Sequence, residues 1–275
     1  MQERTLETWE QFTNELERLY RDHASRQVPH AYISNLLFRG HGDSTWKLET
    51  TLERETAEHL SLDQYFRIIK RIQPKLETLS AVKWETPTVS KYVDWAKNQM
   101  PLSEGECPAV PYLAYLRHHG FPSPLLDWTR SPYVAAFFAF RNRVKDATHT
   151  AICVFLEWAN SSKSGATGHP EIQGIGPNHA IHRRHFMQQS EYTVCTVHRD
   201  EVVYYASHES VFGRNDTDQD LLWKFNIPVS ERAKVLMHLS KMNINAFSLF
   251  GSEDSLLEEL ATTEFVIRGS KRSLG

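Results

Sequence analysis

The sequence contains few cysteines, and their positions argue against two common kinds of small-domain framework. Cys107, Cys153 and Cys195 are the three cysteines among 275 residues, and no two of them form a Cys-x-x-Cys pair. An odd number of scattered cysteines does not suit a disulfide framework or a cysteine-built zinc site. His182 and His185 could share one helix face, but a third ligand is not evident nearby, so we predict no metal site.

Long apolar runs and an excess of basic residues are also missing. No run approaches the ~20 apolar residues that cross a bilayer, and the N-terminal segment is polar and acidic, unlike a signal peptide. We therefore expect a cytoplasmic protein without a membrane partner. The formal net charge is -3, so the bulk composition does not indicate nucleic-acid binding, although a local basic patch is compatible with it.

The remaining composition is that of a globular protein with a sizeable core. Hydrophobic residues make up 40% of the chain and charged residues 24%, close to the usual globular shares. Helical and strand patterns are interspersed, and we see no internal repeat. We predict an α+β fold with a mixed, mainly antiparallel sheet and several interspersed and flanking helices. An N-terminal helical segment is expected over residues 1–30, the main domain over 31–262, and a C-terminal strand or tail over 263–275.

The spacing of apolar residues predicts the individual elements. Helices are expected over residues 8–21, 52–78, 89–99, 110–119, 132–144, 230–241 and 253–260. Strands are expected over residues 31–38, 150–157, 191–198, 221–227 and 263–268. Thr8 and Ser230 are the predicted N-caps of their helices, and Pro74 is expected to kink or break the helix that contains it.

Arg39 is the first candidate for a functional residue, because it ends a predicted buried strand and is followed by Gly40-His41-Gly42. A guanidinium group binds phosphate or carboxylate through two parallel hydrogen bonds. The two glycines would let a ligand approach the backbone closely. The alternative is an arginine that pairs with the protein's own carboxylates, which is a common structural arrangement.

Residues 115–140 form the second and densest group of candidates. Thr129 or Ser131 can cap the following helix, whose first turn offers free backbone N–H groups to an anion. Trp128 offers a ring face on which a nucleobase or nicotinamide could stack. His118 and Asp127 could form a pair in which the carboxylate orients the imidazole. The alternative is a well-capped helix beside a core tryptophan and a satisfied histidine.

These stretches resemble the FRG domain, named for the Phe-Arg-Gly signature that is present here as Phe38-Arg39-Gly40. The family's most specific motif, with its Leu-Leu-Asp-Trp-Thr core, is matched at His118, Gly120, Leu125, Leu126, Asp127, Trp128, Thr129 and Pro132. An upstream family arginine is matched by Arg54, and a later family element by Arg184, Gln188, Tyr192 and Thr193. The sequence departs from the family pattern at Arg117, Ser123, Pro124 and Ser190, where the family tends to have Gln, Thr, Arg and Gly.

The resemblance implies a layout similar to that of ADP-ribosyltransferases, with NAD as the substrate. It implies nucleotide binding by Arg39, Gly40, Arg54, Trp128, Thr129 and Ser131, and catalysis by Arg39, His118, Asp127, Thr129, Gln188 and Glu191. In this hypothesis, Arg39 holds the pyrophosphate and Glu191 stabilises the positive charge that develops on the ribose. Gln188 or Gln189 orients the acceptor, which could be a protein or a nucleic acid, and His118, backed by Asp127, is the general base.

Two other functions stay open at this point. The domain could bind a nucleotide or a nucleic-acid end without catalysis, as a sensor. It could also be a nuclease or another hydrolase that uses His118 and Asp127. The transferase hypothesis would suit a toxin or an anti-phage defence effector.

Overall fold

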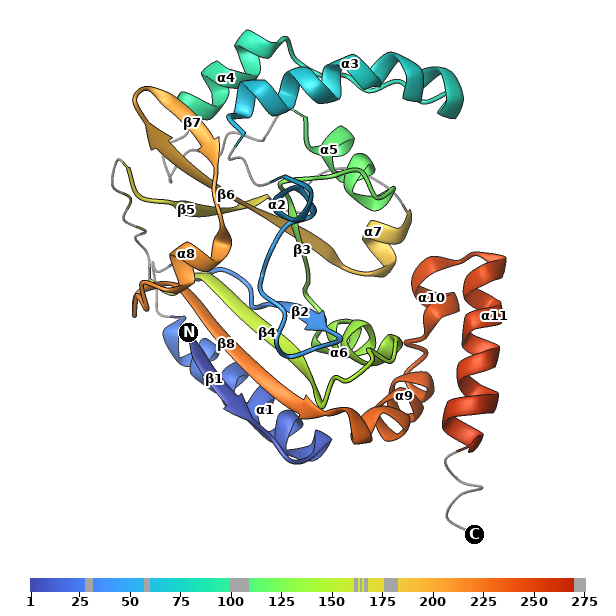
Figure 1. Cartoon of the computed structure of the whole chain (residues 1–275). Helices are drawn as coiled ribbons and strands as arrows, with labels where there is room; N and C mark the ends of the chain where they lie inside the picture. Colours follow the sequence, from blue (N-terminus) through green and yellow to red (C-terminus); the bar gives the residue numbers. More distant parts are fainter. Residues whose placement is uncertain are drawn as a thin grey trace.

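The computed structural model describes residues 1–27, 32–56, 60–98, 109–160, 163, 165, 168–175 and 183–269. Its strands are β1 (Gln2–Thr5), β2 (Leu37–His41), β3 (Leu126–Thr129), β4 (His149–Trp158), β5 (Glu171–Ile175), β6 (Ser190–Arg199), β7 (Val202–Tyr205) and β8 (Gln219–Pro228). They form an eight-stranded sheet in the order β1-β8-β4-β2-β3-β6-β5, with β7 paired to β6 (Figure 1). β1 runs parallel to β8, and the other pairings of the described strands are antiparallel.

Helices surround this sheet. They are α1 (Trp9–Arg26), α2 (Thr51–Glu55), α3 (Leu62–Ser80), α4 (Val89–Asn98), α5 (Val110–His118), α6 (Pro132–Arg141), α7 (Arg183–Met187), α8 (His208–Phe212), α9 (Arg232–Lys241), α10 (Ala246–Phe250) and α11 (Glu253–Ala261). A 3-10 turn, η1 (Val229–Glu231), and a π-helical turn, η2 (Thr262–Ile267), complete the elements. In Figure 1, α3 and α4 lie together at the top beside β7, and α10 and α11 lie at the right beside α6 and α9. The predicted α+β class with a mixed, mainly antiparallel sheet is confirmed.

Several local predictions are also confirmed. The side chain of Thr8 accepts a hydrogen bond from the backbone N–H of Gln11 at 3.3 Å, so Thr8 is the N-cap of α1. The helices expected around residues 110–119 and 132–144 are α5 and α6, and the strands expected around residues 150–157, 191–198 and 221–227 are β4, β6 and β8. Residue 99, the predicted end of the helix over residues 89–99, lies outside the described residues.

Other local predictions are wrong. The segment over residues 263–268 is not a strand, because it continues α11 as the π-helical turn η2; residues 270–275 of the predicted tail lie outside the described residues. Ser230 is not an N-cap, since it lies within η1 and Glu231 precedes α9. The strand expected over residues 31–38 begins only at Leu37, so Arg39 lies within β2 and not at its end. Pro74 does not break its helix, because α3 continues to Ser80, and a kink at Pro74 stays a prediction.

One face of the sheet carries two apolar clusters side by side, and the other face carries a third. Phe38 packs with α1, α6 and α9, whereas Tyr192 packs with α3, α4 and α5. Phe38 pairs with Thr129, and Tyr192 pairs with Asp127. Because Thr129 and Asp127 are two residues apart on β3, the side chains of both pairs point to the same face of the sheet. The opposite face carries a third cluster that includes Trp128 and is covered by α8. Two helical groups therefore stand side by side on one face, and the junction between them lies over β2 and β3.

The pairing between β2 and β3 is the weakest point of the sheet. The two strands share a single residue pair, Phe38 with Thr129, whereas β2 and β4 pair over five residues from Leu37 to His41. Beyond that one pair β2 and β3 diverge, which leaves backbone groups at the junction for side chains to satisfy. The functional candidates Arg39 and Asp127 lie at this divergence.

Gly40 brings the backbone of β2 against helix α6. A Cβ atom built on Gly40 would lie 2.0 Å from the carbonyl oxygen of Ala135 and 2.6 Å from the amide nitrogen of Ala139. The space beside the Gly40 Cα is therefore taken by the helix backbone. The absence of a side chain at this position serves close packing of α6, in addition to any role in admitting a ligand.

We predict that Gly40→Ala destabilises the fold by about 3 kcal/mol, the upper end of the usual cost of overpacking, because two backbone segments must move apart. Urea unfolding followed by circular dichroism measures this change. Gly269→Ala is the matched control, since its Cβ would meet no atom closer than 4.0 Å. An unfolding midpoint for Gly40→Ala equal to that of the control would contradict the contact between α6 and β2.

Candidate functional site

A cavity of about 330 Å³ opens at the junction of β2 and β3. It is lined by Phe38, Arg39, Gly40, Gly42, Trp46, His118, Asp127, Trp128, Thr129, Phe138, Arg141, Asn142, Val144, Arg184, Gln188, Ser190, Tyr192 and Phe250. These residues come from β2, β3 and β6, from α7, from the later parts of α5, α6 and α10, and from the segments that follow β2, α6 and α7. A volume of this size is at the lower end of the range for small-molecule sites.

Arg39 crosses the gap between the diverging strands. Its Nη1 donates a hydrogen bond to the backbone carbonyl of Asp127 at 2.6 Å, and its Nε donates to His41 Nε2 at 3.1 Å. The side chain is only 17% exposed. Burial lowers the pKa of Arg39 to about 10, with the Asp127 carboxylate acting in the opposite direction. The guanidinium group is still cationic at neutral pH and brings a positive charge to the cavity wall.

Asp127 is the carboxylate that lines the cavity, and its main partner is Arg117. Arg117 Nε lies 2.9 Å from Oδ1 of Asp127, and Arg117 Nη2 lies 2.6 Å from Oδ2, in a two-pronged pair. Burial raises the pKa of Asp127, but Arg117 and Arg39 outweigh it, and the pKa lies below its ordinary value. The Asp127 side chain is 39% exposed, so an ionised oxygen faces the cavity. Arg117 occupies a position where the FRG pattern has glutamine, and that departure was the one sequence signal for this pair.

His118 is held by Tyr192. His118 Nε2 lies 2.7 Å from the Tyr192 hydroxyl, and His185 Nδ1 lies 3.2 Å from the same hydroxyl. Burial raises the pKa of Tyr192 well above its ordinary value, so the phenol keeps its proton and can donate to only one of the two rings at a time. Tyr192 therefore helps to orient His118, and His118 is close enough to Asp127 to help lower the pKa of that carboxyl.

Thr129 and Gln188 line the cavity, and both also tie elements together. The Thr129 hydroxyl donates to the backbone carbonyl of Gln188 at 2.7 Å and accepts from the Ser131 amide at 3.1 Å. Gln188 Nε2 donates to the carbonyl of Leu249 at 3.2 Å, which links the end of α7 to α10. Their side chains shape the cavity through these bonds.

Trp128 borders the cavity, but its indole ring points away from it. Alternation along β3 places Trp128 on the opposite face, where it is 3% exposed and stacks on Phe155 at a centroid distance of 5.3 Å. Its Nε1 donates to the hydroxyl of Thr193 at 2.9 Å. The ring is therefore a core element and does not present a free face for a nucleobase or nicotinamide.

Glu191, Ser131 and Arg54 are the predicted site residues that do not line this cavity. Glu191 is opposite Trp128 and so faces the other side of the sheet, where it lies 3.3 Å from Arg130 Nε. Burial raises the pKa of Glu191, with Arg130 opposing the effect. Ser131 caps α6 by accepting from the Val134 amide.

Arg54 lies further back from the cavity. Its Nη1 donates to the carbonyl of Glu49 at 3.0 Å, and its charge contributes to the lowered pKa of Arg39. The N-terminus of α6, expected to bind an anion, is capped by Ser131, and the α6 segment along the cavity is its later part, Phe138 to Arg141. Positive charge at the cavity thus comes from side chains.

Arg141 and Arg184 also line the cavity, and neither was among the predicted site residues. In the sequence, Arg184 was marked by its place in the later family-like element and in the basic run His182-Arg183-Arg184-His185. Arg141 follows the apolar stretch of α6 and carried no signal of its own. Both converge on Phe250 from separate parts of the chain.

The part of the chain that the structure describes has no group of three or more His, Cys, Asp or Glu side chains arranged to hold a metal ion; His182, one of the two histidines considered for a metal, lies outside the described residues. Among the described helices, none has the length and apolar character needed to cross a bilayer.

Among known proteins, the chain matches one family model. No curated protein and no solved structure matches the chain. A family model described as the FRG domain matches residues 34–148. This range includes Arg39, His118 and Asp127 but not Gln188 or Tyr192, so the extension of the domain to residue 262 stays a prediction. With the Phe-Arg-Gly and Leu-Leu-Asp-Trp-Thr motifs both inside the matched range, the chain carries an FRG domain.

Proposed function

We propose that the cavity binds a nucleotide through its phosphate groups, and that its substrate is NAD in an ADP-ribosyltransferase-like or NAD-cleaving reaction. The observation that carries this proposal is the charge of the cavity wall. Arg39, Arg141 and Arg184 line it, and Asp127 is the one acidic residue among the described lining residues. Guanidinium groups in a partly water-excluded site favour phosphate over neutral ligands.

Arg39 would anchor the nucleotide. Its position is fixed by the Asp127 carbonyl and by His41, so the guanidinium group needs little reorganisation when a phosphate binds. With Glu191 on the other face of the sheet, Asp127 is the carboxylate that would stabilise positive charge on the ribose as nicotinamide leaves. His118, held by Tyr192, would take the proton of the acceptor. Consumption of NAD would suit a toxin or an anti-phage effector.

A non-catalytic nucleotide sensor is the second candidate, and a specific contact favours it. The two-pronged pair with Arg117 compensates much of the charge of Asp127, which weakens this carboxylate as a stabiliser of a cationic transition state. The hydrolase alternative would use His118 and Asp127, and the bonds of His118 to Tyr192 and of Asp127 to Arg117 do not favour a direct pair between them.

The proposal is tested by incubating the protein with NAD and following nicotinamide release, together with NAD binding by isothermal titration calorimetry. We expect Arg39→Lys to lower both NAD affinity and turnover by about 10- to 100-fold, because lysine keeps the charge but loses the two-pronged geometry. Arg67→Lys, at an exposed arginine of α3 outside the cavity, is the control and should behave as the wild type. NAD that neither binds nor turns over in the wild type would rule out NAD as the ligand, and binding without turnover would favour the sensor.

Two carboxylate variants identify the acid that acts on the ribose. We expect Asp127→Asn to lower nicotinamide release by about 100-fold, comparable to the loss of one preorganised electrostatic contact in other enzymes. Glu191→Gln should change it by less than about twofold, since this side chain faces the other side of the sheet and does not line the cavity. Single-turnover kinetics at saturating NAD provide the measurement. The reverse ranking of the two variants would show that NAD binds on the other face of the sheet.

A further inference from the structure

Two arginines converge on one aromatic ring at the edge of the cavity. The Cζ atom of Arg141 lies 4.3 Å from the centroid of the Phe250 ring, and the Cζ atom of Arg184 lies 5.5 Å from it. Arg141 ends α6, Arg184 belongs to α7, and Phe250 ends α10. All three line the cavity that also holds Arg39. We refer to Arg141, Arg184 and Phe250 as the arginine pair and its ring.

The ring is held in place by its neighbours. Phe250 meets Phe138 edge-to-face at a centroid distance of 6.1 Å. The chain turns directly after it at Gly251, which has a φ of 65° and caps α10. The bond from Gln188 to the Leu249 carbonyl fixes α10 to the end of α7. Two like charges beside one ring repel each other, and a phosphate between them would lower this repulsion.

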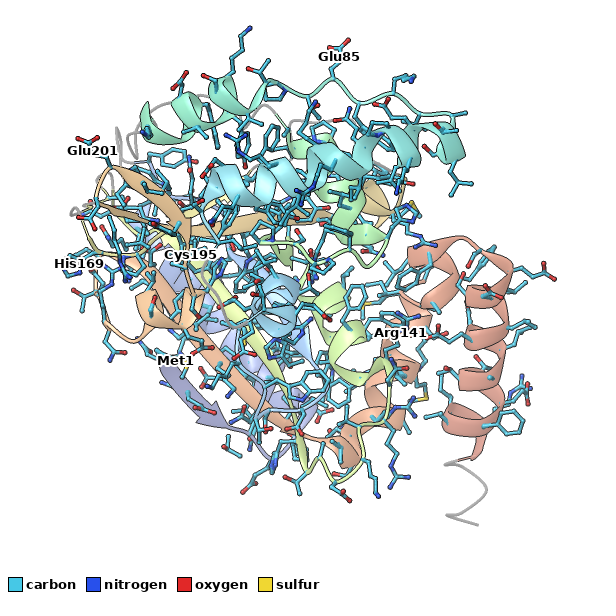
Figure 2. All side chains as sticks on the ribbon, turned by 45° about the horizontal axis from the view of Figure 1, so that its top comes forward. Met1, Glu85, Arg141, His169, Cys195 and Glu201 are labelled. Carbon is cyan, nitrogen blue, oxygen red and sulfur yellow. The ribbon has the colours of Figure 1, made fainter. Side chains whose placement is uncertain are left out.

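One of the two arginines already has a carboxylate partner from the C-terminal part of the chain. Arg141 Nε and Nη2 each lie 2.6 Å from an oxygen of Glu258 on α11. Figure 2 shows Arg141 between α6 and the C-terminal helices. The Arg141 and Glu258 side chains are 27% and 31% exposed. A partly exposed ion pair contributes little net stability, and a phosphate can form the same two-pronged bonds with more negative charge.

We propose that Arg141 and Arg184 form a second phosphate subsite, which makes the cavity selective for a nucleotide that carries a diphosphate. One phosphate binds toward Arg39 and the other at the arginine pair. Glu258 occupies Arg141 when the ligand is absent and competes with the second phosphate. This inference rests on the proposed nucleotide binding and adds the number of phosphates that the site requires.

The test compares ADP, AMP and inorganic pyrophosphate by isothermal titration calorimetry on the full chain. The wild type should bind ADP about tenfold more tightly than AMP, the effect of one added charge-assisted phosphate contact. Arg184→Gln should reduce this ratio to near one by weakening ADP and leaving AMP unchanged. Glu258→Gln should tighten ADP by about three- to tenfold and leave AMP unchanged, because the competing carboxylate is gone. Arg67→Gln is the control for loss of a remote positive charge.

The outcomes separate this inference from the proposed function. Equal affinities for ADP and AMP in the wild type, or an equal loss of both in Arg184→Gln, would overturn the second subsite while nucleotide binding stands. Pyrophosphate that binds in an Arg184-dependent way, with no binding of ADP or NAD, would support the subsite and overturn nucleotide binding. No binding of any of the three probes would overturn both. Thermal unfolding of each variant confirms that the fold is intact before the affinities are compared.

Discussion

The hydrogen bond from the Arg39 guanidinium group to the Asp127 carbonyl is the interaction on which the cavity depends. β2 and β3 pair at one residue pair and then separate, and this bond spans the separation at 2.6 Å. A normal ladder here would close the sheet and leave no room for a cavity. Because a side chain replaces the backbone bond, the sheet stays continuous from β4 to β6 while a polar, water-accessible space opens between the two helical groups.

The same bond explains the charge arrangement around the cavity. Arg39 is held against a carbonyl and a histidine, so its positive charge is only partly neutralised by the carboxylate of Asp127, whose oxygen lies 4.0 Å away. Asp127 in turn gives its closest contacts to Arg117. The cavity therefore keeps an excess of positive charge even though every charged group in its wall has a partner. Such an excess attracts anions over a distance, and salt screens it.

Much of the fold was predictable from the sequence, because long periodic stretches report burial directly. α1, α5, α6, β4, β6 and β8 were predicted in this way, and so was the family through its motifs. Short elements were not predicted, and the omission of β3 had the largest effect on the predicted site. Had Leu126 to Thr129 been recognised as a strand, alternation would have placed Trp128 in the core, with Asp127 and Thr129 toward the site. The pairing of Trp128 with Glu191 would then have removed Glu191 from the cavity as well.

Other features of the site had no signal in a single sequence. Gly40 was interpreted as access for a ligand, but its role in packing depends on where the backbone of α6 lies. Phe250 and Arg141 meet because α10 is folded back over α6, a contact between residues more than a hundred positions apart. The spacing of apolar residues predicts which face of a helix or strand is buried. It does not predict which helices and strands have their ends in contact in the folded protein.

The close approach of Gly40 to α6 has a mechanical consequence. With no side chain between them, β2 and α6 can neither slide nor separate without breaking backbone contacts, so Arg39 and Arg141 are carried on one rigid wall. On the other side of the cavity, α7 and α10 are joined to each other by the bond from Gln188 to the Leu249 carbonyl, and the end of α7 is tied to β3 by the Thr129 hydroxyl. Because α6 packs directly on β2, a change in the width of the cavity would come from movement of α7, α10 and α11 relative to this wall.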